Sequence, residues 1–284
     1  MRFAKAEDFY REAGPFLLQR ETEHCLVLGI CSELIRYPER IEHQPYLATV
    51  VERGEVVAAA LMTPPHNLLL SHCADPEALV PIADDLYGRG VALPGVNGAA
   101  PLSKAFAQLW QARTGQSYEL GMALRIYRLD KVKPVFGVPG RLRRASEADR
   151  ELLLAWIAAF SEAVGEGRDP RDTERTVERF LSSETRGLYL WEDGHPVSMA
   201  GYGGPTPHGM RVSAVYTPPQ YRRRGYASAC VAAVSQLLLD SGRQFCFLFT
   251  DLANPTSNHI YQEVGYRPAC DVDVYRFRSA GDGA

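Results

Sequence analysis

The spacing of apolar and polar positions in the second half of the chain predicts alternating helices and strands. Residues 146–164 carry apolar side chains at helical spacing, and Ser146 followed by Asp149 has the spacing of a capping box at the start of this helix. Residues 245–250 form a continuous apolar run, which is typical of a strand covered on both faces. The other predicted helices are 171–182, 225–241 and 255–264, and the other predicted strands are 187–192, 197–202, 209–217 and 271–278.

This order of elements predicts an α/β fold with a mixed sheet. The strands from 187 to 217 follow one another directly and are expected to be antiparallel, whereas the helix 225–241 makes a crossover to a parallel strand at 245–250. We expect the strand 271–278 to close the same sheet.

The first half of the chain resembles the second half. Residues 118–129 align without gaps on residues 266–277, a constant offset of 148 (266 − 118), so that Tyr127 corresponds to Tyr275. Strand-turn-strand patterns also recur by chance, but matching blocks in the same order favour an internal duplication. Earlier in each half a strand runs into a glycine turn and predicts a hairpin, at 47–54 and at 188–194.

Length and composition are those of a globular protein with two domains. The chain has 284 residues, 46% of them hydrophobic and 23% charged, and a domain commonly takes roughly 100 to 200 residues. Prolines and glycines interrupt regular structure at 131–140. We therefore predict one domain at 1–133, a second at 140–278, and a disordered polar tail at 279–284.

Charge and cysteine usage narrow the possible partners. A net charge of −3 gives no basic field for nucleic acid or an anionic membrane, so we predict neither as a partner. The longest apolar runs are too short to span a bilayer, and the N-terminus has no apolar signal segment. The six cysteines form no C-x-x-C pair, which predicts no metal site and favours reduced thiols in the cytoplasm.

The segment from Val215 to Ser228 is the most informative for chemistry. A strand ends there, three arginines follow, and Gly225 and Ala227 open a helix with little side-chain bulk. The first turn of a helix presents unpaired N–H groups and the positive end of the helix dipole, and arginines add charge-assisted donors. The segment therefore predicts a pyrophosphate site; the alternative is a solvated basic turn before an ordinary helix.

A second segment carries a polar stripe. Asn254 is expected to cap a helix that Pro255 begins. Asn254, either Ser257 or Asn258, and Tyr261 then fall on one face of that helix, so the stripe ends in a phenol and predicts a polar ligand. The alternative for Tyr261 is a tyrosine that packs its ring in the core.

Together these segments resemble the GCN5-related N-acetyltransferase (GNAT) family. Arg222-x-x-Gly225-x-Ala227 is similar to its Q/R-x-x-G-x-G/A signature, and Asn254 to Tyr261 is similar to its N-x-x-(A/S)-x-x-x-Y segment. The resemblance covers 141–278 and implies two tandem acetyltransferase-like domains, each a mixed, mostly antiparallel sheet flanked by helices. It implies acetyl-CoA as co-substrate, bound by Val215, Tyr216, Thr217, Arg222, Arg223, Arg224, Gly225, Tyr226, Ala227, Ser228, Asn254 and Ser257.

The chemistry of an amine attacking a thioester assigns further roles. A backbone N–H near Val215 would donate to the developing oxyanion, and Tyr261, with an unperturbed pKa of about 10, would protonate the departing thiolate. The candidates for a general base are Glu162, Glu166, Asp169 and Asp251, although each is more typical of a solvated surface carboxylate.

The first half lacks the features of the phosphate site. Asp75 and Glu77 stand where the second half has three arginines, and carboxylates there would repel a pyrophosphate. Ala100-Pro101 takes the place of Asn254-Pro255, and Trp110 lies near the place of Tyr261. The first half therefore resembles an acetyltransferase repeat that has become a scaffold.

These observations predict an enzyme, an N-acetyltransferase that moves acetyl from acetyl-CoA to a primary amine. We expect a small-molecule acceptor and a monomer or homodimer. The alternatives are transfer of a longer acyl or an aminoacyl group, and a non-catalytic module that only binds acyl-CoA.

Overall fold

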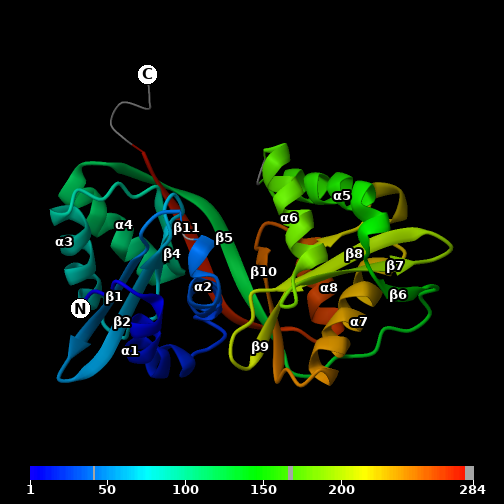
Figure 1. Cartoon of the computed structure of the whole chain (residues 1–284), viewed down its shortest axis with the longest axis horizontal. Helices are drawn as coiled ribbons and strands as arrows, with labels where there is room; N and C mark the ends of the chain where they lie inside the picture. The colour runs from blue at the N-terminus through cyan, green and yellow to red at the C-terminus, as the bar shows by residue number, and fades with distance from the viewer. Residues whose placement is uncertain (41, 166–168, 279–284) are drawn as a thin grey trace. The chain divides into compact units, whose positions relative to one another are not determined.

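The computed structural model describes residues 1–40, 42–165 and 169–278 (Figure 1). Its internal contacts divide the chain into two compact units. Unit 1 comprises Met1–Ile126, Thr250–Ala253 and the chain from Ala269 onward, and unit 2 comprises Tyr127–Phe249 and Asn254–Pro268. The tail predicted to be disordered, 279–284, lies outside the described residues.

Unit 1 has helices on both faces of a sheet in the strand order β1-β2-β3-β4-β11-β5. The hairpin predicted at 47–54 is confirmed, because β1 and β2 pair antiparallel around Gly54, whose φ is +87°. The elements are α1 (Ala6–Leu18), α2 (Cys25–Arg36), β1 (Tyr46–Glu52), β2 (Glu55–Met62), β3 (Leu68–Leu70), α3 (Val80–Gly88), β4 (Gly95–Ala99), α4 (Ala100–Thr114), β5 (Ser117–Leu129) and β11 (Arg267–Arg278).

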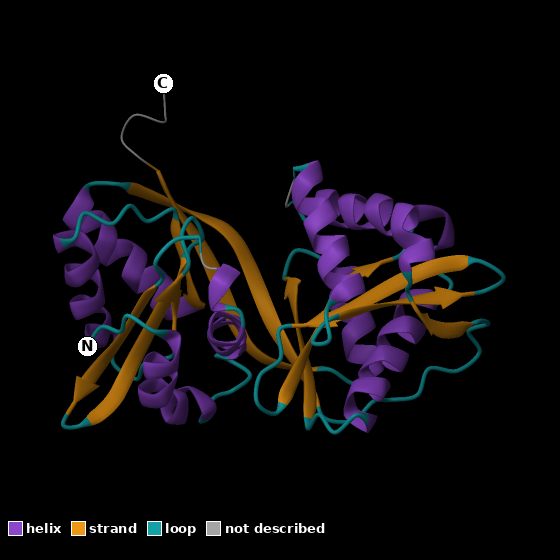
Figure 2. Ribbon diagram, in the orientation of Figure 1, coloured by secondary structure: helices purple, strands orange, loops and turns teal. Residues whose placement is uncertain are grey.

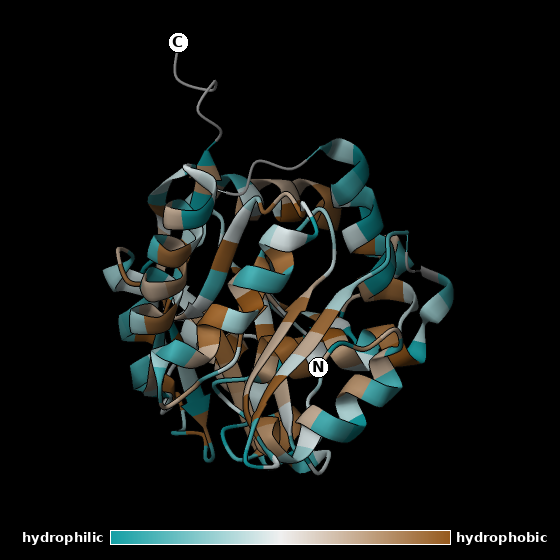
Figure 3. Ribbon diagram, turned by 90° about the vertical axis from the view of Figure 1, so that its left-hand side faces the viewer, coloured by the Kyte–Doolittle hydropathy of each residue, from teal (hydrophilic) through white to brown (hydrophobic). Residues whose placement is uncertain are grey.

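Alternation along the strands of unit 1 sends neighbouring side chains to opposite faces of its sheet. Leu47 and Leu61 pack with α1 and α2, whereas Ala48 and Ala60 pack in a second cluster with α3 and α4. In Figure 3, which views the molecule from the side of unit 1, apolar residues are concentrated on the strands and on one side of the helices. Burial on both faces explains why β2 and β3 are almost wholly apolar.

Unit 2 contains the strand order β5-β10-β9-β8-β7-β6. Its helices also cover both faces, with α5 and α6 in one apolar cluster and α7 and α8 in another (Figure 2). The elements are β6 (Arg141–Arg144), α5 (Arg150–Ala163), α6 (Pro170–Ser182), β7 (Gly187–Glu192), β8 (Pro196–Gly203), β9 (Gly209–Tyr216), α7 (Tyr226–Asp240), β10 (Phe245–Asp251) and α8 (Pro255–Val264).

The predicted α/β fold with a mixed sheet is confirmed. Strands β7, β8 and β9 are antiparallel, and β9 pairs parallel with β10 after the crossover helix α7. The same order occurs in unit 1, where β1 and β2 form the hairpin and β3 pairs parallel with β4 across α3. The two units thus repeat one sequence of elements.

The prediction that 271–278 closes the sheet of the second half is wrong. These residues of β11 belong to unit 1, where Val272 pairs with Ala99 and Arg276 with Gly95. In unit 2 the neighbour of β10 is β5, which comes from the first half of the sequence. Strands 118–129 and 266–277 are similar in sequence, so the pattern that predicts each strand does not specify its partner.

The observed units also differ from the linear domains 1–133 and 140–278. The change of unit falls between Ile126 and Tyr127, and the segment 131–140 is attached to unit 2. Its Lys133 N–H donates to the Val264 carbonyl at 2.8 Å, and the Pro139 carbonyl accepts from the Trp191 indole at 2.8 Å. Proline and glycine end the regular structure there, but these hydrogen bonds keep the segment packed.

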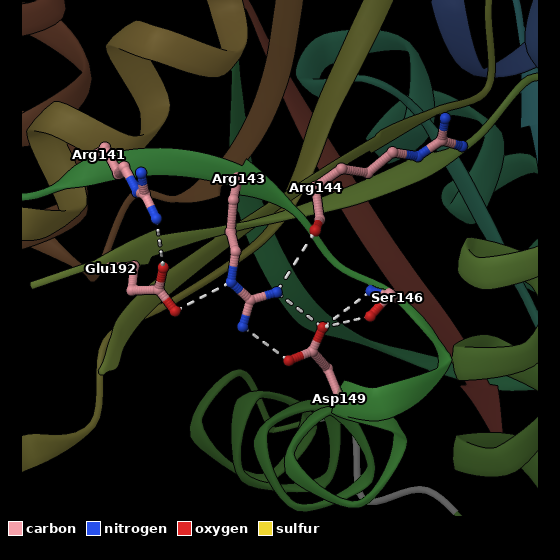
Figure 4. A network of polar contacts seen from close by, with 6 residues as sticks. All are labelled: Arg141, Arg143, Arg144, Ser146, Asp149 and Glu192. Carbon is pink, nitrogen blue, oxygen red and sulfur yellow. Dashed lines mark hydrogen bonds and ion pairs between the residues drawn. The ribbon is translucent and has the colours of Figure 1, made fainter. Parts of the chain in front are cut away.

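A polar network fixes the first strand of unit 2 to its first helix (Figure 4). The Arg143 guanidinium on β6 makes two 2.8 Å hydrogen bonds to Asp149 and one of 3.0 Å to Glu192 on β7. The predicted cap is also present, because the Asp149 carboxylate accepts from the Ser146 N–H at 2.8 Å. Hydrogen bonds from Arg143 lower the pKa of Asp149 to about 2, since they stabilise its charged form.

Candidate functional site

Strand β9 changes its pairing where the sequence predicts the acyl group to lie. Opposite β8, Gly201 pairs with Ser213 and Met199 with Tyr216, so two residues of β9 face one of β8. The resulting bulge includes Ala214, whose φ of +50° is in the left-handed region. On the other side, the registered pairing with β10 ends at Phe247 and Arg211, five residues before β9 ends. Tyr216 therefore keeps its pairing with β8, whereas Val215 and Tyr216 lie beyond the registered pairing with β10.

Two side chains hold this strand end in place. Ser198 on β8 lies 2.8 Å from the Thr217 hydroxyl and donates to the Tyr216 carbonyl at 3.2 Å. The Arg222 Nε donates to the Thr217 carbonyl at 2.9 Å. Of the three arginines predicted to bind pyrophosphate, Arg222 thus stabilises the loop, because its guanidinium already donates one hydrogen bond to the backbone.

The arginine loop leads into helix α7 through two left-handed residues. Arg222, Arg223 and Arg224 are exposed, Arg223 has a φ of +62°, and Gly225 has a φ of +79° at the N-cap. The first intrahelical bond runs from the Ala229 N–H to the Gly225 carbonyl at 2.9 Å. The N–H groups of Tyr226, Ala227 and Ser228 in the first turn consequently have no intrahelical acceptor and suit an anion.

Gly225 has a packing role that the sequence did not indicate. A Cβ at this position would lie 2.8 Å from Cγ2 of Val138, which comes from the segment 131–140. The glycine is thus required by its left-handed backbone and by this close contact, independently of any ligand. Substitution of Gly225 would disturb the fold, so a loss of phosphate binding in such a variant could not be attributed to the site itself.

Two of the predicted loop residues have side chains that face the protein. Tyr226 is buried and its hydroxyl donates to Asp193 at 2.6 Å, and Ser228 is buried as well. The hydrogen bond to Asp193 raises the pKa of Tyr226 above its ordinary value, because the carboxylate stabilises the phenol. Only the backbone N–H groups of these residues are suited to contact a ligand.

Asn254 caps helix α8 as the sequence predicts. Its Oδ1 accepts from the Ser257 N–H at 3.0 Å, and its carbonyl accepts from Nδ2 of Asn258 at 2.7 Å. Asn254 is exposed and Ser257 is partly exposed. The cap engages the acceptor atoms of Asn254, so its side-chain amide is the group with which it would donate to a ligand.

Tyr261 lies on α8 with its ring in the core of unit 2. It is 7% exposed, and its ring centroid lies 6.0 Å from that of Tyr266. No hydrogen bond of its hydroxyl occurs among the described residues. Burial raises the pKa of Tyr261 to about 12, because desolvation disfavours the phenolate. Tyr261 is therefore both a core aromatic residue and a phenol that keeps its proton at neutral pH, and Val215 packs against the same apolar cluster.

Tyr127 lies beside Tyr261, although no local pattern in the sequence singles it out. It comes from β5, its side chain is fully buried, and its ring centroid lies 6.4 Å from that of Tyr261. Its hydroxyl donates to Oδ1 of Asn258 at 3.1 Å and accepts from Nε2 of Gln262 at 2.9 Å. Its similarity to Tyr275 was visible, but its position beside α8 follows from strand pairing, which no local pattern specifies.

The candidate bases have structural or exposed positions. Asp169 caps α6 by accepting from the Arg171 N–H at 2.8 Å, and Asp251 accepts from the Ala253 N–H at 2.8 Å. Glu162 is exposed, and Glu166 lies outside the described residues. For Glu162, Asp169 and Asp251 this agrees with the interpretation as surface carboxylates.

The described residues contain neither a metal-binding group nor a membrane-spanning helix. Residues 1–40, 42–165 and 169–278 contain no group of three or more histidine, cysteine, aspartate or glutamate side chains arranged to hold a metal ion. No helix within these ranges has the length and apolar character needed to cross a membrane. All six cysteines are free thiols, five of them buried.

Known proteins were compared with the chain. Residues 151–266 match the model of the acetyltransferase (GNAT) family. A GCN5-related N-acetyltransferase from Sphaerobacter thermophilus is 16% identical with a TM-score of 0.60, over 87% of this chain and 84% of that chain. One from Kribbella flavida is 16% identical with a TM-score of 0.55, over 89% and 96%. A Drosophila protein is 11% identical with a TM-score of 0.70, over 98% of both chains. No curated protein matches significantly.

The fold and the match define the class of protein. The bulged strand β9, the basic loop and the crossover helix α7 all lie within the segment that matches the acetyltransferase (GNAT) family. Residues 151–266 match an acetyltransferase domain of the GNAT family, and solved GNAT structures are similar in fold over most of the chain, which is consistent with two GNAT-like units. At these identities the solved structures support the fold, and the family model supports acyl transfer.

Proposed function

We propose that the protein transfers acetyl from acetyl-CoA to a primary amine of a small molecule, using one site in unit 2. The observation that carries this proposal is the end of β9, which extends beyond its registered pairing with β10 and runs into the exposed arginine loop and the open first turn of α7. A thioester arm with a pyrophosphate at its end has the chemistry that such a strand end and helix start would bind.

The binding mode follows from the groups available. The N–H groups of residues 223–228, with Arg223 and Arg224, would hold the pyrophosphate. Val215, Tyr216 and Thr217 would pair with the pantetheine arm as an added strand, and the amide of Asn254 would donate to it. Arg222 contributes by bracing Thr217, and Ser257 by its place in the α8 cap.

The reaction is a direct attack. The nitrogen lone pair of the amine forms a bond to the thioester carbon, and a backbone N–H near Val215 stabilises the negative charge on oxygen. The C–S bond then breaks, sulfur keeps its electron pair, and Tyr261 gives it a proton. The amine nitrogen loses its extra proton to water, and Tyr261 regains one from solvent. The raised pKa of Tyr261 keeps this proton in place before the bond breaks.

Unit 1 is proposed to be a degenerate repeat that binds no acetyl-CoA. It repeats the order of elements of unit 2, but Asp75 accepts from the Glu77 N–H at 3.0 Å where unit 2 has its arginines. A carboxylate of the chain thus lies at the helix start where an anion would bind. We expect a monomer or homodimer in the cytoplasm.

The test combines binding and turnover. Calorimetry of the full-length protein should give one acetyl-CoA per chain, and release of free thiol should depend on adding one of a panel of small amines. A stoichiometry of two would contradict the assignment of unit 1. Binding without thiol release from acetyl-CoA or from longer acyl-CoA donors, with any amine, would leave a non-catalytic acyl-CoA-binding module.

A further inference from the structure

We propose that Tyr127, supplied by the first half of the sequence, is a positioning residue for Tyr261 in the acyl-transfer site. This inference rests on the proposed function. It gives β5 a role in the reaction, because the end of β5 that includes Tyr127 belongs to unit 2. There Tyr127 lies beside α8, the helix that contains the proposed acid Tyr261.

The first observation is that one hydroxyl holds two positions of α8. The Tyr127 oxygen bonds to Asn258 at 3.1 Å and to Gln262 at 2.9 Å, and these residues lie one helical turn apart on the same side. Both bonds lie along one edge of α8, so they fix its rotation about its own axis as well as its distance from β5. Rotation of α8 would move Tyr261, which is the residue just before Gln262.

The second observation is that the network reaches the cap of α8. Asn258 accepts from Tyr127 and donates through Nδ2 to the Asn254 carbonyl at 2.7 Å. The side-chain oxygen of Asn254 in turn accepts a hydrogen bond from the Ser257 N–H. The helix start that is proposed to contact the pantetheine arm is therefore connected to Tyr127 through one intervening side chain.

The third observation concerns the ring of Tyr261. Its centroid lies 6.4 Å from that of Tyr127, with an interplanar angle of 53°, and 6.0 Å from that of Tyr266, at 65°. Tyr266 is itself fixed, because its hydroxyl lies 2.8 Å from Oγ of Ser235 on α7. Two fixed aromatic neighbours restrict the Tyr261 side chain, so its hydroxyl has a defined direction. A phenol that must meet a departing sulfur needs such restriction, since a displacement of about 1 Å can cost about 100-fold in rate.

The duplication offers a matched control. Tyr275 is the aligned residue of the other repeat, and it lies in unit 1 with its ring centroid 5.6 Å from that of Tyr118. Tyr275 is 7% exposed, the same fraction as Tyr261, but it has no part in the proposed site. Tyr127→Phe and Tyr275→Phe each remove one hydroxyl and keep the ring.

The experiment is a double-mutant cycle in the full-length protein, measured as thiol release at saturating acetyl-CoA and amine. Tyr127→Phe should lower kcat by about 10- to 100-fold, with acetyl-CoA affinity changed by less than about threefold. In a Tyr261→Phe background the same change should lower kcat by less than about twofold, because the residue it positions no longer gives a proton. Tyr275→Phe should leave kcat unchanged in both backgrounds.

Two kinetic results would overturn the inference. One is an unchanged kcat in Tyr127→Phe; the other is an equal loss in both backgrounds, which is the result expected of a merely structural role. Hydrogen exchange provides a readout that needs no turnover: α8 amides should exchange faster in Tyr127→Phe and at the original rate in Tyr275→Phe. Unchanged exchange of α8 would also overturn the inference. A wild-type protein without turnover would instead overturn the proposed function, and it is recognised before any variant is made.

Discussion

Helices α3 and α7 occupy the same place in their units, between two parallel strands, but they begin differently. Before α7 the chain has three exposed arginines and a left-handed glycine, so the first N–H groups are open. Before α3 a short 3₁₀ turn, Pro76–Leu79, is capped by the Asp75 side chain. Unit 1 has no arginine at this turn, and its own carboxylate caps the 3₁₀ turn that leads into α3. The same order of elements can therefore carry either a helix start with open N–H groups or a helix start that the chain caps itself. A few residues at one turn decide between the two.

The second pair of helices, α4 and α8, shows the same contrast. α8 has Asn254 as a side-chain cap and Tyr261 with a hydroxyl that has no partner among the described residues. The N-cap of α4 is Ala99, which has no side chain to accept a hydrogen bond, and its Trp110 donates its indole N–H to Gln116 at 2.8 Å. The side-chain cap of α8 has no counterpart in α4. The indole of Trp110 already has a hydrogen-bond partner, whereas the hydroxyl of Tyr261 has none among the described residues.

The largest effect is expected when the phenol of unit 2 is removed. Tyr261→Phe keeps the ring between its aromatic neighbours but removes the proton, so kcat should fall by about 10²- to 10⁴-fold while acetyl-CoA still binds. Thiol release under conditions where the chemical step limits the rate, together with calorimetry, measures this. The loss should shrink for an acyl donor whose thiol leaves more easily. Turnover at the wild-type rate would make Tyr261 a core residue only.

The pH dependence of this variant is an independent check. Because burial raises the pKa of Tyr261 to about 12, the wild-type enzyme should not lose activity through this phenol between pH 8 and 10. A raised pKa also stabilises the fold below pH 10, and that contribution is lost as the pH rises from about 10 to about 12. Tyr261→Phe should therefore unfold with a smaller alkaline dependence than the wild type.

A smaller effect is expected when the arginine loop is made to resemble unit 1. Arg223→Glu places a carboxylate before α7 without changing the left-handed backbone, since both residues carry a Cβ. Acetyl-CoA affinity should fall at least about tenfold, which corresponds to about 1.4 kcal/mol. Arg11→Glu, an exposed position on α1, makes the same change in net charge and should leave affinity unchanged. An equal loss in both variants would attribute binding to general electrostatics.

The smallest effect concerns stability. Asp149→Asn removes the carboxylate that holds Arg143 and the Ser146 N–H, and should lower the free energy of unfolding by about 1 to 2 kcal/mol in denaturant. Acetyl-CoA affinity should not change. Asp8→Asn, which removes an exposed ion pair with Arg11 in unit 1, should cost less than about 0.5 kcal/mol.

Acid titration sharpens this prediction. The pKa of Asp149 is lowered to about 2 in the folded protein, so its contribution is present above about pH 4 and is lost as the pH falls towards 2. The difference in stability between wild type and Asp149→Asn should shrink over this range. A difference that stayed constant would mean that the network does not act through the ionised carboxylate.

Local patterns in the sequence were sufficient for most elements of unit 2. The helix at 255–264 and the strand at 187–192 have the predicted bounds, because Asn254, Pro255 and the glycine turns fix their ends locally. The bulge in β9 could not be placed from a local pattern, since its position depends on the register with β8. The prediction of Tyr261 and of the arginine loop as site residues stays a prediction.

Local patterns could not predict which strands pair with each other. β5 and β11 are similar in sequence, so either would satisfy the same apolar neighbours, and the linear order favours pairing within each half. The roles of Tyr127 and Val138 were therefore not recognisable. Both residues act through contacts with segments more than 80 positions away in the chain.

The pairing of β11 with β4 has a consequence for biosynthesis. A ribosome delivers β4 about 170 residues before Val272, its first partner in the register with Ala99 (272 − 99 = 173). Until then β4 has an open edge, which is the kind of surface that recruits other strands and promotes aggregation. Unit 1 thus begins the chain but is among the last parts to be completed, and any event that stops translation early leaves it with a missing strand.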